Sequence, residues 1–147
     1  MKVLVFDPDR CTGCHACEEA CSQKWFKEAN RDKSAIQILE PDAKGTYQAI
    51  TCTQCGDCID VCPTEAIRRT KSGVVLIRKT ACVGCLACVG FCRIWAMRTH
   101  ADYVEPFKCV ACGGCVEACP ENALSIQELA DVGPSDTAKW AERMGAR

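Results

Sequence analysis

Long apolar side chains along this chain of 147 residues occur in short runs that polar segments separate. The runs VLVF (3–6) and VVLI (74–77) are the clearest, and each is long enough for one short strand. Strands are predicted at residues 2–6, 48–51, 74–77 and 123–126, and a helical pattern, EEACSQKWFKEA, covers residues 18–29. The pattern therefore predicts an α+β fold built from short elements.

Turn signals separate some of these elements. Lys44-Gly45 and Ser72-Gly73 are typical of turns between paired strands, and the second lies within the predicted hairpin RRTKSGVVLIRK. After Leu129 the segment DVGPS indicates a linker, and TAKWAERM indicates a short helix that Ser135 or Asp136 could cap. Trp140 and Met144 share one face of that helix, so a partner-binding tail and a frayed surface helix both stay open.

Cysteine dominates the composition, with 16 residues in four copies of the spacing C-x2-C-x2-C-x3-C. We number these motifs one to four in chain order. A proline follows the last cysteine of motif two and of motif four. The four groups are Cys11, Cys14, Cys17 and Cys21; Cys52, Cys55, Cys58 and Cys62; Cys82, Cys85, Cys88 and Cys92; and Cys109, Cys112, Cys115 and Cys119.

Charge and hydropathy exclude several classes of partner. The 18 basic and 19 acidic residues give a net charge of −1, so nothing favours nucleic acid or an anionic membrane surface. No apolar stretch approaches the length of a membrane span, and MKVLVFDPDR has no export signal. We therefore expect a cytoplasmic protein without direct membrane insertion, whose clustered cysteines bind metal.

Three chemistries compete for the thiols. Disulfides need an oxidising compartment and separations that packed C-x2-C pairs seldom provide. Zinc sites use two separated C-x2-C pairs, whereas here a third and a fourth cysteine follow at once. The run C-x2-C-x2-C-x3-C-P is the signature of bacterial ferredoxins. The spacing therefore indicates iron–sulfur clusters, and sixteen cysteines are enough for four [4Fe-4S] clusters.

The spacing also has a physical reason. Three cysteines at two-residue intervals let a tight loop hold one corner of a cluster, and Gly13 and Gly84 allow close approach of the backbone. The fourth cysteine, which we expect at the start of a helix, reaches a different cluster in two-cluster ferredoxins. Motif two has Gln54 where motifs one and three have glycine, which predicts a polar neighbour near its cluster.

Complete ligation bears on function. With four thiolates for every cluster, no iron is left open for a substrate, so one-electron transfer is the chemistry available and we expect no enzyme activity. An oxidised cluster with four thiolates carries about −2, which would bring the whole protein to about −9. Arg10, Lys79 and Lys108, each just before a motif, could offset this charge or be ordinary surface residues. Because other core formers are sparse, we expect the iron-free chain to be largely disordered.

The sequence resembles the four-cluster iron–sulfur subunits of molybdenum and tungsten enzymes. These include the electron-transfer subunits of the dimethyl sulfoxide reductase superfamily and the small polyferredoxin subunits of tungsten aldehyde oxidoreductases. The resemblance covers residues 1 to about 128 and rests on the four motifs in order, CPTEAI (62–67), the first spacer with its AIQILE strand, and KCVAC (108–112). At 147 residues the chain lacks the long insertions of the larger subunits, so it is most similar to the compact aldehyde-oxidoreductase kind.

The resemblance implies two nested ferredoxin-like modules. Residues 1–46 with 99–128 would form the outer module from motifs one and four, and residues 47–98 the inner module from motifs two and three, followed by a tail at 129–147. Tandem pairing of one with two and three with four stays open from the spacing. Nesting implies four ligand sets: Cys11, Cys14, Cys17 and Cys119; Cys109, Cys112, Cys115 and Cys21; Cys52, Cys55, Cys58 and Cys92; and Cys82, Cys85, Cys88 and Cys62.

The resemblance further implies a role in anaerobic metabolism. The chain would relay single electrons between a catalytic molybdenum or tungsten oxidoreductase subunit, of which aldehyde oxidoreductase is one kind, and a second electron-transfer subunit or carrier. A free-standing polyferredoxin that serves several enzymes is the alternative. Self-stacking of copies into longer wires is left open.

Four residues near the motifs invite a functional interpretation. His15 is expected to be an ordinary loop residue, since four cysteines already serve each cluster. Trp25 and Phe26 could form a docking patch or pack internally. Trp95, three residues after the last cysteine of motif three, is expected to shield a cluster from water.

Overall fold

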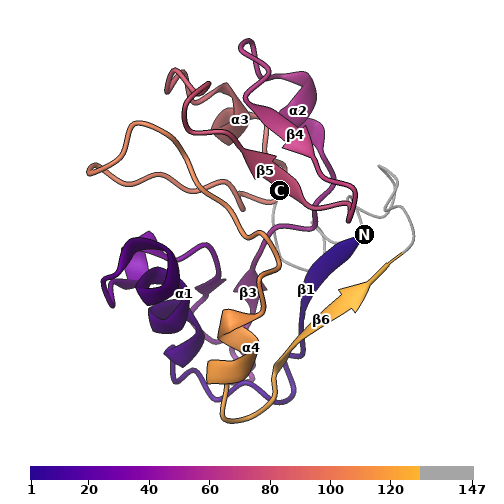
Figure 1. Cartoon of the computed structure of the whole chain (residues 1–147). Coiled ribbons are helices and arrows are strands. Elements are labelled where there is room, and N and C mark those ends of the chain that lie inside the picture. The colour runs from indigo at the N-terminus through magenta and orange to yellow at the C-terminus, as the bar shows by residue number, and fades with distance from the viewer. Residues whose placement is uncertain (130–147) are drawn as a thin grey trace.

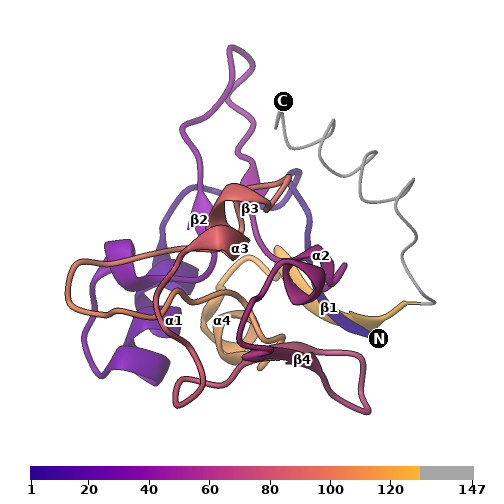
Figure 2. The same ribbon diagram turned by 90° about the horizontal axis from the view of Figure 1, so that it is seen from above.

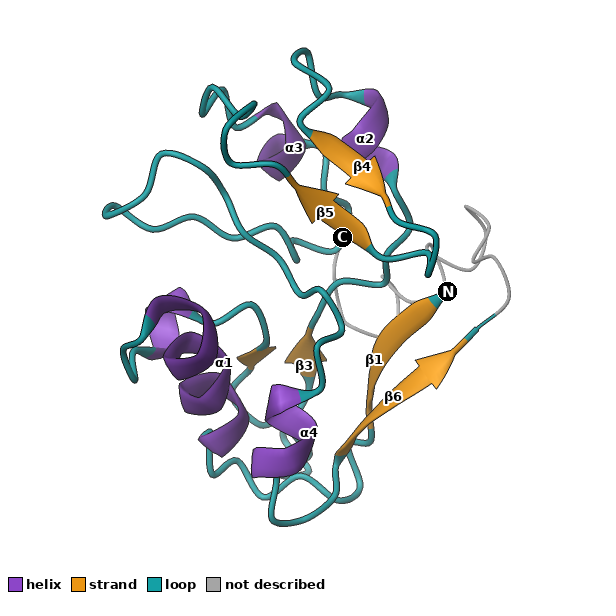
Figure 3. Ribbon diagram, in the orientation of Figure 1, coloured by secondary structure: helices purple, strands orange, loops and turns teal. Residues whose placement is uncertain are grey.

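The computed structural model describes residues 1–129, so the predicted linker and terminal helix, with Trp140 and Met144, lie outside the described residues. Within these residues no helix is long and apolar enough to cross a bilayer. All elements are short (Figures 1 and 3). In chain order they are β1 (Lys2–Phe6), α1 (Ala16–Phe26), a 3-10 turn (Arg31–Lys33), β2 (Gln37–Ile38), β3 (Ala49–Ile50), α2 (Asp57–Asp60), β4 (Ile67–Arg69), β5 (Val75–Ile77), α3 (Ala87–Gly90), α4 (Gly114–Ala118) and β6 (Leu124–Glu128).

The first and last strands of the described residues pair with each other. β1 runs antiparallel to β6, with Lys2 opposite Glu128 and Phe6 opposite Leu124. Figure 1 shows the two strands side by side. The pairing brings motif one, which follows β1, next to motif four, which precedes β6, and helices α1 and α4 pack against each other.

The middle of the protein forms a second half. β4 and β5 make an antiparallel hairpin, and α2 packs against both α3 and β4. In Figure 1 this half lies apart from α1 and α4, and in Figure 2, which views the molecule from above, the two halves overlap. The start of β1 contacts the second half, because the amide of Lys2 donates to the carbonyl oxygen of Ser72 at 3.3 Å. The short antiparallel pair β2–β3 follows α1 and leads from the first half into the second.

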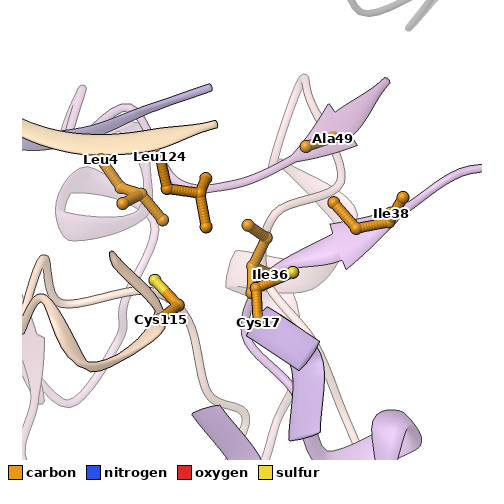
Figure 4. Packing of buried hydrophobic residues seen from close by; sticks show 7 residues of the cluster. All are labelled: Leu4, Cys17, Ile36, Ile38, Ala49, Cys115 and Leu124. Atoms are coloured by element: carbon orange, nitrogen blue, oxygen red, sulfur yellow. The ribbon is translucent and has the colours of Figure 1, made fainter. Parts of the chain in front are cut away.

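Apolar side chains fill only a small core, and cysteines are part of it. In the half that contains β1 and β6, Ile36 is 1% exposed and packs with buried residues from both strands and both helices. Figure 4 shows this cluster, with a cysteine of α1 and a cysteine of α4 facing the aliphatic side chains. Its buried members are Leu4, Cys17, Ile36, Ile38, Ala49, Cys115 and Leu124.

Most predicted elements are present with small shifts. β1 has the predicted bounds, and β5 and β6 overlap the predicted strands, although β6 runs two residues further, to Glu128. Both predicted turns are formed: the amide of Gly45 donates to Asp42, the amide of Gly73 donates to Thr70, and both glycines have positive φ. The predicted α+β fold class is confirmed.

The expected helix at each fourth cysteine is wrong for three of the four motifs. Only Cys21 lies within a helix, because α1 continues for eleven residues. The helices of motifs two, three and four contain the third cysteine and end before the fourth. Proline follows Cys62 and Cys119, and the residue before a proline is disfavoured in helical conformation, so the backbone leaves the helix there.

Candidate metal centres

The four motifs fold into the same backbone shape. In each, the residue before the second cysteine has a φ between 52° and 73°, in the left-handed region that favours glycine. Glycine fills this position in motifs one and three, whereas Gln54 and Ala111 adopt the same conformation with a side chain. The residue after the second cysteine is left-handed as well and begins the short helix that contains the third.

Backbone amides point at the sulfur atoms. Amides two residues further on donate to the first cysteines of motifs two and four, at 3.3 Å from Gln54 to Cys52 and 3.4 Å from Ala111 to Cys109. Fourth cysteines accept in the same way, as in the 3.4 Å bond from the Ala123 amide to Cys119. Such bonds favour the thiolate, the form in which cysteine binds metal.

Each motif has its own small cavity, and the structure places a cysteine from another motif in each one. Cys119 lines the motif-one cavity, and Cys21 lines the motif-four cavity. Cys92 lines the motif-two cavity, and Cys62 lines the motif-three cavity. The remaining lining cysteines are the first three of each motif: Cys11, Cys14 and Cys17; Cys109, Cys112 and Cys115; Cys52, Cys55 and Cys58; and Cys82, Cys85 and Cys88.

The four cavities are alike in size, with empty volumes between about 320 and 420 Å³ that include space open to solvent. All sixteen thiols are free of disulfide bonds. Among residues 1–129, no three Cys, His, Asp or Glu side chains converge closely enough to hold a single metal ion. The thiols thus surround a space and do not meet at a point, which fits a polynuclear cluster better than tetrahedral zinc.

Burial differs along each motif in a regular way. The second cysteine is exposed in motifs one, three and four, whereas the third is buried in the same motifs. Burial raises the pKa of Cys17, Cys58 and Cys115 to about 12. Buried thiols of this kind give up their protons only to a metal, so metal binding there is coupled to deprotonation.

A polar atom without a partner gives an independent test of the fit. The hydroxyl of Thr53 is buried, has no hydrogen-bond partner within residues 1–129, and belongs to a residue that lines the motif-two cavity. A hydroxyl can donate to a sulfur of a bound cluster, as it can to a thiolate. The residues present therefore fit an iron–sulfur cluster.

His15 is part of an ordered network. It precedes α1, and its Nδ1 contacts Oε2 of Glu18 at 2.5 Å. Glu18 is 2% exposed, accepts from Nε of Arg31 at 2.9 Å, and accepts from the backbone amide of Ile38 at 2.9 Å. Sequence reasoning missed this network, since Glu18 has the pattern of an exposed residue in the first turn of a helix.

Two expectations about aromatic residues have clear outcomes. Trp95 is 59% exposed and itself adopts a left-handed φ of 55° in the turn after Cys92, so the expected shielding of a cluster by its side chain is wrong. Phe26 packs internally, with ring centroids 4.8 Å from Tyr103 and 5.0 Å from Phe107. Trp25 is 52% exposed, so only this member of the pair stays available at the surface.

Gln54 connects two motifs. The sequence predicts a polar neighbour at this position, and the side chain is fully buried. Its Nε2 donates to the carbonyl oxygen of Cys109 at 2.9 Å, and its Oε1 accepts from the side chain of Lys108 at 2.9 Å. The residue therefore joins motif two to motif four, a contact that no local pattern contains.

Family models identify the chemistry. A 4Fe-4S dicluster domain matches residues 10–66, a second 4Fe-4S dicluster domain matches residues 44–93, and a 4Fe-4S binding domain matches residues 102–125. The first two matches overlap on motif two, so they do not decide how the motifs pair. The prediction of four [4Fe-4S] clusters is confirmed by these domains together with the sixteen cysteines.

Several curated proteins similar to this one are subunits of reductases. The protein is 33% identical over 98 residues to the B subunit of anaerobic dimethyl sulfoxide reductase from Haemophilus influenzae, a match that covers 55% of this protein and 47% of the relative. It is 30% identical over 90 residues to the thiosulfate reductase electron transfer subunit of Salmonella typhi, with 56% and 47% covered. The matches span less than half the length of these relatives.

Among solved structures, the protein is similar to one component of the active site complex BamBC of benzoyl coenzyme A reductase with zinc. The TM-score is 0.50 at 20% identity, and the match covers 100% of this protein and 91% of the other, so the similarity concerns the fold. The predicted resemblance to iron–sulfur subunits of molybdenum enzymes is confirmed by the curated relatives. The protein therefore contains 4Fe-4S ferredoxin-type domains over residues 10–93 and 102–125, and it is similar to subunits of anaerobic dimethyl sulfoxide reductase and thiosulfate reductase.

Proposed function

We propose that this protein is a non-catalytic subunit that conducts single electrons through four [4Fe-4S] clusters within an oxidoreductase complex. The observation that carries the proposal is the set of four cavities, each lined by three cysteines of one motif and one of another. Bound clusters supply one-electron chemistry, and the protein holds them in fixed positions. Two relatives named as an electron transfer subunit and an iron–sulfur subunit support the same role.

For the ligands, we propose the nested assignment. The outer module, residues 1–46 with 99–128, would bind one cluster through Cys11, Cys14, Cys17 and Cys119 and another through Cys109, Cys112, Cys115 and Cys21. The inner module, residues 47–98, would bind one through Cys52, Cys55, Cys58 and Cys92 and another through Cys82, Cys85, Cys88 and Cys62. Support comes from the lining of the cavities and from the pairing of β1 with β6.

The nested assignment gives the clusters an order. The cavities of motifs four and two are neighbours, since Cys52, Cys92 and Cys109 pack in one group with Ile94. Motif one shares the outer module with motif four, and motif three shares the inner module with motif two, so the cavities of motifs one and three would lie at the two ends. Electrons would enter at one end and leave at the other, so a linear relay fits this arrangement better than a storage protein.

For the partners, we propose a catalytic subunit of molybdenum or tungsten type, with an aldehyde oxidoreductase as one candidate, and a second electron carrier. The similarity to the B subunit of dimethyl sulfoxide reductase and to the thiosulfate and arsenate reductase subunits supports the molybdenum type. The alternative is a free-standing polyferredoxin that serves several enzymes.

Gentle anaerobic purification of the native protein tests these proposals. A relay subunit is expected to elute with a larger protein that contains molybdenum or tungsten, and with about 16 Fe per copy of the relay subunit. Elution alone at about 16 kDa would contradict the subunit proposal and favour the free-standing polyferredoxin. Zinc without iron in the isolated protein would contradict electron transfer itself.

A further inference from the structure

Lys108 is a buried lysine at the junction between the two halves of the molecule. The residue is 7% exposed. Its Nζ donates to Oε1 of Gln54 at 2.9 Å and to the carbonyl oxygen of Cys109 at 3.0 Å. Among residues 1–129, no carboxylate lies within ion-pair distance of this ammonium group.

The surroundings of Lys108 belong to two cysteine cavities. The lysine lines the cavity of motif four and also the cavity of motif two. It does not line the cavities of motifs one and three. The positive charge therefore stands between two neighbouring cluster sites and away from the other two.

Gln54 holds the lysine in this place. Its Oε1 accepts from Lys108 and from the backbone amide of Val75 at 3.0 Å, while its Nε2 donates to the carbonyl oxygen of Cys109. The backbone of Gln54 has a φ of 62°, and glycine occupies the equivalent position in motifs one and three. A non-glycine residue in this region carries backbone strain, so the contacts of the side chain must compensate for it.

A buried ammonium group without a carboxylate is unfavourable unless other negative charge lies near it. A [4Fe-4S] cluster with four thiolates supplies such charge, about −2 when oxidised and one unit more negative when reduced. Because attraction between opposite charges is strong where water is excluded, a fixed positive charge stabilises the reduced cluster more than the oxidised one. Net charge near a cluster is one of the terms that set its reduction potential.

We propose that Lys108, held by Gln54, raises the reduction potentials of the clusters of motif two and motif four. The inference rests on the proposed function and deepens it, because these two clusters lie where electrons cross between the halves of the protein. Their raised potentials favour residence of the electron in the middle of the relay. The ammonium group acts on both sites because it lines both cavities.

Redox titration of the full-length protein with four clusters, followed by electron paramagnetic resonance, tests the proposal. In Lys108→Met, two of the four midpoint potentials are expected to shift to more negative values, while the other two stay in place. Lys108→Arg retains the charge and is expected to keep all four near their wild-type values. The matched control is Lys79→Met, which removes a lysine whose side chain is 66% exposed and which is expected to leave the same two midpoints unchanged.

Each other outcome has a defined meaning. Unchanged midpoints in Lys108→Met, or equal shifts of all four, contradict the proposal while electron transfer stands, provided that all four clusters still reduce. If Lys108→Met fails to bind four clusters, Lys108→Gln, which can still donate to Gln54, is titrated in its place. If neither neutral variant binds four clusters, the lysine serves assembly and the proposal is wrong. A wild-type protein without reducible clusters contradicts the proposed function instead.

Discussion

Cys119 lies in the same cavity as Cys11, although the two residues belong to the last and the first motif of the sequence. The antiparallel pairing of β1 with β6 accounts for this proximity, because one strand precedes motif one and the other follows motif four. Cys14 and Cys17 complete the lining by cysteine. The relationship leads to a direct test of which thiols share a cluster.

Substitutions of two cysteines that bind the same cluster should not have additive effects on the number of intact clusters. Under the nested assignment, Cys14→Ser and Cys119→Ser each disrupt the cluster of motif one, by loss or by conversion to a three-iron cluster. The double variant Cys14→Ser/Cys119→Ser should then still contain three intact clusters and about 12 Fe, since both changes strike the same site. Anaerobic iron analysis measures the iron content, and the spin count of the reduced protein measures the number of intact clusters.

The matched control combines Cys119→Ser with Cys85→Ser, which lies in the motif-three cavity. Here two different clusters are damaged, so only two intact clusters should remain, with about 8 Fe in total if the damaged clusters are lost and about 14 Fe if each becomes a three-iron cluster. The spin count of intact [4Fe-4S] clusters therefore decides between the two pairings. Tandem pairing predicts the reverse, because Cys119 would then serve motif three. Three intact clusters in the control variant, with two in Cys14→Ser/Cys119→Ser, would therefore rule out nesting.

Removal of iron should unfold most of the protein. Cysteines make up part of each buried group of side chains, and the strands outside the motifs are at most five residues long. Without clusters, the remaining apolar contacts are too few to offset the conformational entropy of folding. Anaerobic chelation should abolish the protection of backbone amides from hydrogen exchange, and reconstitution with iron and sulfide should restore it. Persistent protection of β1 and β6 in the iron-free protein would show that the protein core is sufficient by itself.

Each buried aliphatic side chain of this small core should contribute measurably to the free energy of unfolding. Ile36 is 1% exposed and packs in the cluster of Figure 4. Ile36→Ala should lower the free energy of unfolding by about 2–5 kcal/mol, because it deletes buried methyl groups and leaves a cavity. Denaturant unfolding of the cluster-loaded protein under anaerobic conditions measures the change. Val83→Ala is the control, since Val83 is 63% exposed and its truncation should change stability by less than about 0.5 kcal/mol. Equal effects of the two substitutions would contradict the role of Ile36.

The sequence predicts those parts of the molecule that local chemistry determines. The run VLVF gives β1, and the cysteine spacing gives the loops, because both depend on residues that are near one another in the sequence. At Cys62 and Cys119 the following proline disfavours a helix and outweighs the helix-forming residues nearby. Cys92 has no proline after it, and α3 still ends at Gly90, an ending that the sequence does not signal. The contact between Gln54 and Lys108 joins residues 54 positions apart, and no periodicity or spacing contains it.

The buried network around Glu18 also joins residues that are far apart in the sequence, and it contributes to stability. Its Oε1 accepts the backbone amide of Ile38, and its Oε2 contacts His15 and Arg31. Glu18→Ala should cost about 1–3 kcal/mol of stability, because the buried amide of Ile38 loses its acceptor. Glu18→Gln should cost less, since an amide oxygen can still accept from Ile38.

Glu19 provides the matched control for this pair of variants. It is the next residue of α1, it is exposed, and Glu19→Ala removes the same charge without uncovering a buried donor. Denaturant unfolding of the three cluster-loaded variants measures the midpoint of each transition. If the slope of the unfolding free energy against denaturant concentration is the same for all three, the midpoint should be lowest for Glu18→Ala, next for Glu18→Gln and close to wild type for Glu19→Ala. A Glu18→Gln variant as unstable as Glu18→Ala would show that the charge interactions with His15 and Arg31, and not the acceptor for Ile38, hold the first motif against β2.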